Sequence, residues 1–228
     1  MGVTDHYRKI EDIPKRIPLF PLPEAILLPR TNLPLNIFEP RYLSMIEDVL
    51  AGDRLIGMVQ PVGLEGGDIP VPIDGQIELR KIGCAGRITA FQETEDGHCL
   101  ITLSGIARFE TVQEIDIDTP YRMWDVNYSN YSSDVVQGFG EDDIDRDYLL
   151  LVLKEYLRAN SLEADWSSIR KSSNEFLVNT LSIISPYGVE EKQALLEAAD
   201  LKIRADVLIA LAQMELAAPE DGSGTKLQ

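Results

Sequence analysis

Hydrophobic spacing divides the chain into two parts. Residues from about 13 to 128 carry short apolar runs separated by Pro and Gly, which is typical of strands joined by turns. Residues from about 146 to 217 repeat apolar positions with the period of helices. Residues 129–145 between them are rich in Ser, Asn, Gly and acidic side chains, and we interpret them as a linker or surface loop. The pattern predicts an α+β chain with a β-rich subdomain over 1–128, a helical subdomain over 146–217 and a loose tail over 218–228.

Prolines interrupt the start of the β-rich part, at positions 18, 21, 23, 29 and 34. Because proline cannot donate a ladder hydrogen bond, we expect them at edges, bulges or ends of strands. Short strands are predicted over 17–20, 25–28, 35–38 and 55–60. Pro40 suits the first turn of a helix, where its missing N–H costs nothing, and Gly52 suits the end of that helix.

The clearest β element is a hairpin, with strands over 86–92 and 98–103 and a turn at 93–97. Asp96 and Gly97 tolerate the positive φ that such turns require. Further strands are predicted over 107–117 and 121–128. In this register Cys84 faces a residue near Ala107 and Cys99 faces one near Gln92. Eight residues of strand, about 26 Å, then separate the two pairs. This is too far for a disulfide, so we expect free thiols, which suit a reducing compartment.

Four helices are predicted in the second part. The first carries the apolar stripe from Tyr148 to Leu157, the second covers 168–184, the third covers 190–198, and Asp200 is a suitable N-cap for the fourth. The pattern expects Phe176 and Ile184 of the second helix, and Ile203 and Met214 of the fourth, to face inward.

Charge restricts the choice of partners. The formal net charge is −17, a field that repels nucleic acid and anionic membrane surfaces. No apolar run reaches the roughly 18 residues of a transmembrane helix, and residues 1–11 lack the apolar core of a signal peptide. We therefore expect a cytoplasmic protein with no nucleic-acid or membrane partner.

A search for catalytic and cofactor motifs yields no site. The phosphate-binding loop, the dinucleotide fingerprint and the nucleophile elbow are absent, and His6 and His98 lie in a polar terminus and beside a turn. The cysteine and histidine spacings do not fit zinc. Asp143, Asp145 and Asp147 begin like a calcium loop, but Tyr148 and Lys154 replace its essential Gly and Glu. We expect no cofactor, no metal and no catalytic residue.

Several motifs resemble the N-terminal substrate-binding domain of Lon proteases, over about residues 17 to 212. The stretch that ends in Phe38-Glu39-Pro40-Arg41-Tyr42 is the most specific of them. The motifs that carry the resemblance are Pro18–Leu22, Leu27–Pro29, Leu33–Tyr42, Gly83–Ile88, Asp96–Gly97 and Leu103–Phe109, with a looser match at Pro186, Lys192–Glu197 and Arg204.

The resemblance implies a PUA-like, strongly bent sheet or pseudo-barrel followed by a helical bundle. It also implies a polypeptide-binding module for unfolded or tagged proteins, acting as an adaptor or holdase, with a protease or chaperone machine as partner. The 228 residues contain neither a Walker A motif nor the Ser-Lys protease module, so peptidase activity does not carry over. The alternatives are an RNA-binding PUA-like protein, which the charge disfavours, and a small-ligand protein or enzyme with an unrecognised site.

The proline-bounded segment Leu19–Leu35 is the preferred binding site. It combines apolar side chains with backbone that cannot form a regular ladder, which suits strand addition by a client peptide. A charge at Leu33 or Leu35 is expected to weaken client binding, unless these residues belong to the core. The candidate contact residues are Leu19, Phe20, Leu33, Leu35, Phe38, Glu39, Arg41, Tyr42, Arg87 and Arg108.

Each polar or aromatic candidate also has a structural interpretation. Glu39 and Arg41 form a clamp beside a peptide groove, or Glu39 caps a helix while Arg41 pairs with the sheet. Phe38 and Tyr42 are more typical of a core. Arg87 and Arg108 either meet acidic residues of the domain or form a basic spot on an acidic protein.

Overall fold

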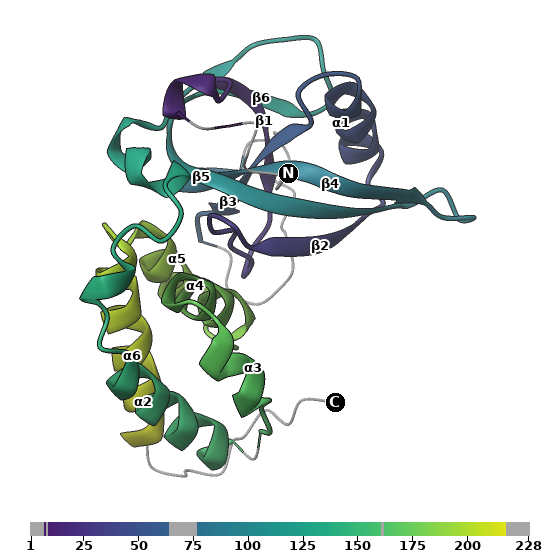
Figure 1. The fold of residues 1–228 in the computed structure, drawn as a ribbon. Helices are drawn as coiled ribbons and strands as arrows, with labels where there is room; N and C mark the ends of the chain where they lie inside the picture. The colour runs from purple at the N-terminus through teal and green to yellow at the C-terminus, as the bar shows by residue number, and fades with distance from the viewer. Residues whose placement is uncertain (1–6, 8, 64–76, 161, 218–228) are drawn as a thin grey trace.

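One bent sheet forms the β-rich half of the molecule. The computed structural model describes residues 7, 9–63, 77–160 and 162–217, and within them the sheet has six strands. They run in the order β2-β5-β4-β3-β1-β6, and a further pairing of β5 with β6 closes all but β2 into a ring. Their bounds are β1 Arg16–Pro21, β2 Asn32–Ile37, β3 Leu55–Pro61, β4 Leu79–Glu93, β5 Cys99–Ile115 and β6 Arg122–Asn127. The α+β prediction and the pseudo-barrel are confirmed (Figure 1).

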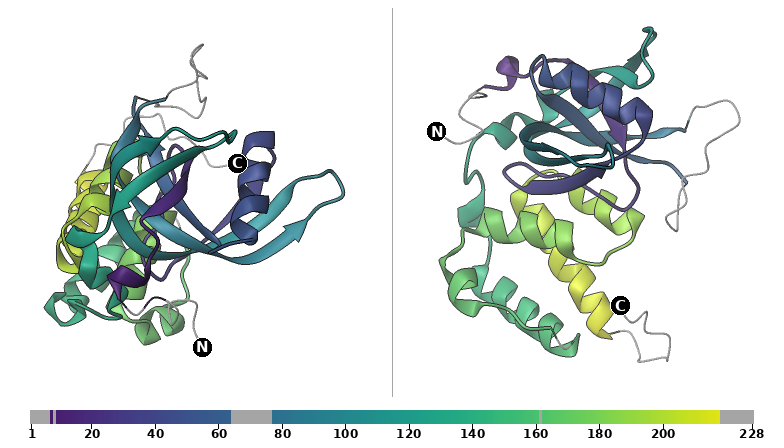
Figure 2. Two further views of the ribbon diagram at one scale, coloured as in Figure 1. Left: turned by 90° about the horizontal axis from the view of Figure 1, so that it is seen from above. Right: turned by 90° about the vertical axis from the view of Figure 1, so that its right-hand side faces the viewer.

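The helix predicted to begin at Pro40 is α1, Pro40–Leu50. Pro40 occupies its first turn, and Tyr42, Met45 and Ile46 on one face are buried in the main core. In Figure 2, α1 lies on the opposite side of the barrel from the helical half. The prediction of this helix from Pro40 and Gly52 is therefore confirmed.

The hairpin strands are longer than their sequence pattern predicts. The turn falls within the predicted residues, but 98–103 and 107–117, predicted as separate strands, belong to one continuous strand, β5. Cys84 faces Arg108 and Cys99 faces Glu93, each one position from the expected register, because the turn pairs Glu93 with Cys99. The bulges at Ile88/Ala90 and Ala85/Gly86 shift the pairing in opposite directions and cancel before Cys84. Both cysteines are free and buried.

The predicted strand over 25–28 is wrong. These residues have no regular secondary structure, yet Ile26, Leu27 and Leu28 are buried in the main core. Two glycines of the hairpin make room for them. A Cβ on Gly105 would lie 2.0 Å from the carbonyl oxygen of Leu28, and one on Gly86 would lie 2.5 Å from the Leu27 side chain.

The helical half contains five α-helices among the described residues: α2 Arg146–Ala159, α3 Trp166–Lys171, α4 Asn174–Ile184, α5 Val189–Glu197 and α6 Leu201–Ala217. Asp200 caps α6 as predicted, since its carboxylate accepts from the Ile203 amide at 2.8 Å. No helix in the described ranges is long and apolar enough to cross a bilayer.

The single helix predicted over 168–184 is interrupted between α3 and α4. The hydroxyl of Ser173 caps α4 by accepting from the Phe176 amide at 3.1 Å, a local bond that competes with helix continuation. The break changes which face of α4 is buried, and Phe176 and Ile184 are exposed instead of inward. Ile203 and Met214 of α6 are exposed as well, so these inward assignments are wrong.

The segment predicted as a linker carries part of the core. It contains the 3-10 helices η3, Ser129–Val135, and η4, Glu141–Asp143, while another, η2, spans Ile10–Asp12. Tyr131, Asp134 and Ile144 are buried. Residues 218–228, predicted as a loose tail, lie outside the described residues.

Candidate functional site

Strand β2 is the open edge of the sheet. It pairs with β5 from Asn32 opposite Ser104 to Ile37 opposite Cys99, and it has no second strand partner among the described residues. Pro34 lies in the middle of β2, an edge position as the sequence analysis expects. An edge strand presents unpaired backbone N–H and C=O groups, with which an extended peptide can pair.

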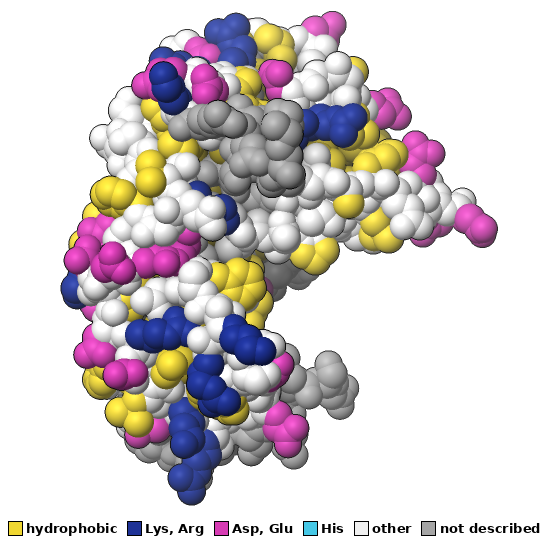
Figure 3. Space-filling model, in the orientation of Figure 1, with side chains coloured by type: hydrophobic (Ala, Val, Ile, Leu, Met, Phe, Trp, Pro, Cys, Tyr) yellow, Lys and Arg dark blue, Asp and Glu magenta, His cyan; other side chains and the backbone are white. Residues whose placement is uncertain are grey.

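The outer face of β2, β5 and β4 forms a shallow groove beside this edge. Its volume is about 480 Å³. Register places Leu100 of β5 between Asn36 of β2 and Gln92 of β4. Because side chains alternate along a strand, Leu100 points away from the core face that holds the buried Ile101, and Leu100 is 43% exposed. Figure 3 shows hydrophobic side chains along this projecting hairpin. The groove residues are Pro34, Leu35, Asn36, Ala90, Phe91, Gln92, Leu100, Ile101 and Thr102.

Four of the residues predicted to contact a client are buried instead. Leu19, Phe20 and Tyr42 belong to the hydrophobic cores, and Arg108 is 1% exposed. The rings of Phe20 and Tyr42 pack edge to face with centroids 4.5 Å apart. Their burial shows that these side chains hold the fold beneath the surface.

Leu33 and Leu35 are half-buried, because they point from β2 toward the main core and pack against it. Phe38, just beyond β2, is 59% exposed, and its ring centroid lies 5.8 Å from that of His98 at the hairpin turn. Leu35 lines the floor of the groove from the strand edge although its side chain points to the core, while Phe38 extends the exposed apolar surface near it.

Neither expected arrangement of Glu39 and Arg41 is present as such. Glu39 is the N-cap residue of α1 but its side chain accepts no capping bond. Arg41 pairs with Glu39 itself at 2.8 Å instead of with the sheet, and its guanidinium lies 4.5 Å from the centre of the Tyr42 ring. Both charges are partly exposed, so the pair stays at the surface beside α1.

The two arginines near the hairpin have different surroundings. Arg87 donates to the backbone carbonyl of Asp53 at 3.3 Å and remains partly exposed. Arg108 donates to both carboxylate oxygens of Asp134, at 2.8 and 2.9 Å, inside the molecule. For Arg108 the interpretation as a partner of an acidic residue is correct.

Among the residues that the structure describes, the other ionisable groups include no metal-binding cluster and no activated thiol. Within the described ranges, no three His, Cys, Asp or Glu side chains are grouped as a metal would require. Burial raises the pKa of Cys84, which keeps its thiol protonated and poorly nucleophilic. Asp145, part of the calcium-like run, caps α2 by accepting from the Tyr148 amide at 3.0 Å.

The exposed leucine of the groove, Leu100, was missed as a candidate. Its signal is present in the sequence, since in a hairpin strand with Ile101 and Leu103 inward, an apolar residue at 100 must face out. The pairing of this strand with β2, which completes the groove, has no comparable local signal.

A bent, nearly closed sheet with an open edge strand and an attached helical bundle defines an α+β fold. The chain belongs to the family of the ATP-dependent protease La (LON) substrate-binding domain, whose model matches residues 16–213.

Curated relatives support the same family. The chain is 27% identical to the Lon protease of Flavobacterium johnsoniae over 198 residues, which is 86% of this chain and 23% of the relative. It is 28% identical to the Lon protease of Parabacteroides distasonis over 221 residues, 92% of this chain and 25% of the relative. The chain thus spans about a quarter of the length of these relatives.

Solved structures share the fold. A Lon N-terminal domain protein from Xanthomonas campestris superposes with a TM-score of 0.58 at 20% identity, covering 90% of this chain and 99% of that one. The N-terminal domain of Mycobacterium avium complex Lon protease gives 0.59 at 15% identity, covering 87% and 98%.

Proposed function

We propose that this protein binds unfolded or tagged polypeptides at the edge of β2 and in the adjoining groove, without catalysis of its own. The observation that carries the proposal is the combination of an edge strand that has one strand partner within the described ranges with an exposed apolar side chain, Leu100, on that partner. Backbone pairing gives affinity for any extended chain, and the groove accepts alternate apolar side chains. Membership of a substrate-binding family supports the same function.

The sharpest test places a charge in the groove without touching the core. Leu100→Glu should weaken binding of an unfolded model protein about tenfold, because a carboxylate would lose hydration against apolar client side chains. Val112→Glu is the matched control, since Val112 is 61% exposed on the same strand but outside the groove. Fluorescence anisotropy with a labelled, reduced and carboxymethylated client measures both. Equal affinities for wild type and Leu100→Glu would exclude the groove.

Strand addition has its own test. A client peptide with N-methyl groups at alternate residues loses the donors on one edge but keeps its side chains. If the client pairs with β2, this peptide should bind much more weakly than its unmethylated parent, whereas methylation on the other edge should matter less. Similar affinities for all three peptides would leave side-chain contacts as the only source of binding.

We further propose that the protein acts as an adaptor or holdase, with a protease or chaperone machine as partner in the adaptor case. A holdase should suppress aggregation of a denatured client at stoichiometric amounts without ATP. An adaptor should enrich one folded partner from lysate, identified by mass spectrometry, and Leu100→Glu should lose clients while keeping that partner. Low-salt filter binding to RNA is the control for the alternative that the charge of −17 disfavours.

A further inference from the structure

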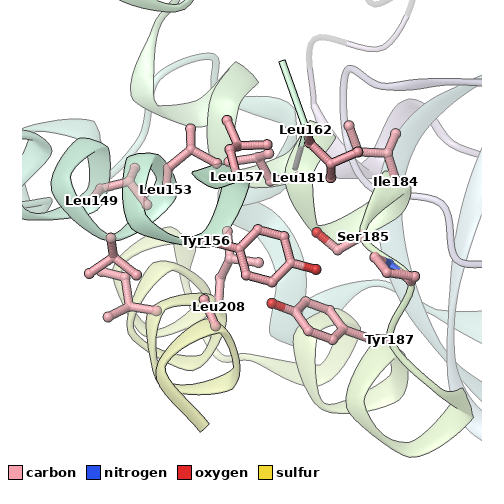
Figure 4. A pocket seen from close by; sticks show the side chains of 14 residues that line it. Leu149, Leu153, Tyr156, Leu157, Leu162, Leu181, Ile184, Ser185, Tyr187 and Leu208 are labelled. Atoms are coloured by element: carbon pink, nitrogen blue, oxygen red, sulfur yellow. The ribbon is translucent and has the colours of Figure 1, made fainter. Parts of the chain in front are cut away.

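The helical half contains a cavity of about 130 Å³ between α2, α4 and α6. Aliphatic side chains from all three helices form most of its wall, including Leu153, Leu181 and Leu208 (Figure 4). An apolar cavity of about 150 Å³ in another protein holds one benzene ring, so this volume matches a single ring. The groove on the sheet lies in the other half of the molecule and shares no residue with it.

Hydroxyl groups interrupt this apolar wall at one place. Tyr156, which is 6% exposed, has a buried hydroxyl that makes no hydrogen bond of normal geometry with the described residues. The exposed Glu215 carboxylate lies near enough to compete for its proton, but is too poorly placed to satisfy it. Figure 4 shows the hydroxyls of Tyr156, Ser185 and Tyr187 turned toward the same part of the cavity. A buried hydroxyl without a partner is unfavourable, so a ligand that offers a hydrogen bond there gains affinity.

Both tyrosines stay protonated near neutral pH. Burial raises the pKa of Tyr156 to about 12, and the nearby Glu215 carboxylate adds to the shift. Burial also raises the pKa of Tyr187. Each phenol can therefore donate as well as accept a hydrogen bond.

The mouth of the cavity is apolar too. Leu162 and Ile184 line it and are exposed on the surface, so a hydrophobic group meets a hydrophobic rim before it enters. A ligand that suits the whole site has an apolar body the size of one ring and one polar tip.

We propose that the cavity between α2, α4 and α6 binds a phenol group, with its ring among the aliphatic side chains and its hydroxyl at the hydroxyls of Tyr156, Ser185 and Tyr187. The phenol can belong to a Tyr side chain of a polypeptide or to a free small molecule. This inference is independent of the proposed function of the groove.

The test uses p-cresol and toluene, which differ by one hydroxyl. Titrations of the full chain, followed by amide chemical shifts, should give tighter binding of p-cresol by about two- to tenfold, the effect of one hydrogen bond. Tyr156→Phe keeps the ring but removes the hydroxyl, and it should reduce that preference to near unity. Absence of p-cresol binding at millimolar concentration, or an unchanged preference in Tyr156→Phe, would overturn the proposal.

A second variant tests the location. Ala212 of α6 is buried at the cavity wall, so Ala212→Leu should fill the space and lower p-cresol affinity about tenfold or more. Ala210→Leu is the matched control, because Ala210 is exposed on the same helix and does not line the cavity. Unchanged affinity in a folded Ala212→Leu variant would overturn the proposal. If circular dichroism shows that this variant is unfolded, Tyr156→Phe decides alone.

Competition separates the two sources of the group. If a peptide with one Tyr displaces p-cresol, and the same peptide with Ala does not, the cavity takes a polypeptide side chain. If p-cresol binds and neither peptide competes, the cavity takes a free small molecule. Both results support the site. Leu100→Glu should bind p-cresol like wild type, so failure of the groove proposal stays distinguishable from failure of this one.

Discussion

The guanidinium of Arg108 is held from both halves of the molecule. It donates to Asp134 in the segment after the sheet, and to the carbonyl oxygens of Leu196, at 3.1 Å, and Ala198 at the end of α5. Its centre lies 4.3 Å from the Tyr131 ring. The sequence alone is compatible with both an acidic partner for Arg108 and a basic surface spot. Asp134 could not be identified as that partner, because it lies 26 positions away in a stretch whose composition is that of a loop.

Asp134→Ala should lower the free energy of unfolding by about 3–5 kcal/mol, since it leaves the Arg108 charge buried without a counter-ion. Urea denaturation followed by circular dichroism measures the change. Asp125→Ala is the control, because Asp125 pairs with an exposed arginine, Arg16, and such pairs contribute roughly 0–1 kcal/mol. A loss below 1 kcal/mol for Asp134→Ala would mean that water reaches Arg108 in the folded protein.

Among the elements, those with local signals were predictable. Helix α1 follows from Pro40 and its apolar face, and the hairpin follows from Asp96-Gly97 between alternating strands. The prediction of a strand over 25–28 is wrong. A short apolar run has the same composition whether it forms a strand of the sheet or packs beneath the sheet without regular secondary structure. The position of this segment depends on glycines about 60 and 80 residues further along the chain, Gly86 and Gly105, which no local pattern connects to it.

This dependence makes Gly105→Ala a test of how the segment is held. The added methyl would collide with the Leu28 backbone, which unlike a side chain end cannot rotate away. We expect a loss of about 1–3 kcal/mol or more in the free energy of unfolding, measured by chemical denaturation. Gly52→Ala is the comparison, because its Cβ would meet nothing closer than 3.9 Å, and it should stay within about 0.5 kcal/mol of wild type. Equal stability of the two variants would contradict the close packing of β5 on residues 25–28.

Leu35 lies on the edge strand β2 and its side chain also packs against the core. We expect Leu35→Glu to lower thermal stability by several degrees as well as client affinity, since it buries part of a carboxylate. Leu100→Glu should affect only affinity. A Leu35→Glu variant that melts like wild type would mean that β2 detaches from the core without cost.

For the whole molecule, the division of the chain into a β-rich and a helical part was visible in its apolar spacing, but the connection between the parts was not. Polar contacts join them at several places. Arg30, after the buried segment, pairs with Glu175 of α4, and Asn179 of α4 donates to the Pro29 carbonyl at 3.2 Å. Gln60 of β3 donates to the Val189 carbonyl at 3.1 Å and to the Gln193 side chain at 2.9 Å. These side chains lie far apart in sequence, and their pairing follows only from the folded arrangement.

Such a junction predicts that the two halves unfold together. Separating them would expose the buried charges of Arg108 and Asp134 along with the carbonyls that Arg108 satisfies, so a state with only one half folded is unfavourable.

The chain has two tryptophans, and they report on different halves: Trp124 lies on β6 and Trp166 on α3. Trp124→Phe and Trp166→Phe variants therefore give one fluorescence probe for each half. For each variant, the urea midpoint measured by fluorescence should equal the midpoint measured by circular dichroism on the same variant. In Asp134→Ala, where the junction holds an unpaired charge, the helical transition should move ahead of the β transition. If the transitions are already separate in the wild-type background, the two halves are independent folding units, and the buried ion pair joins them only after each has formed.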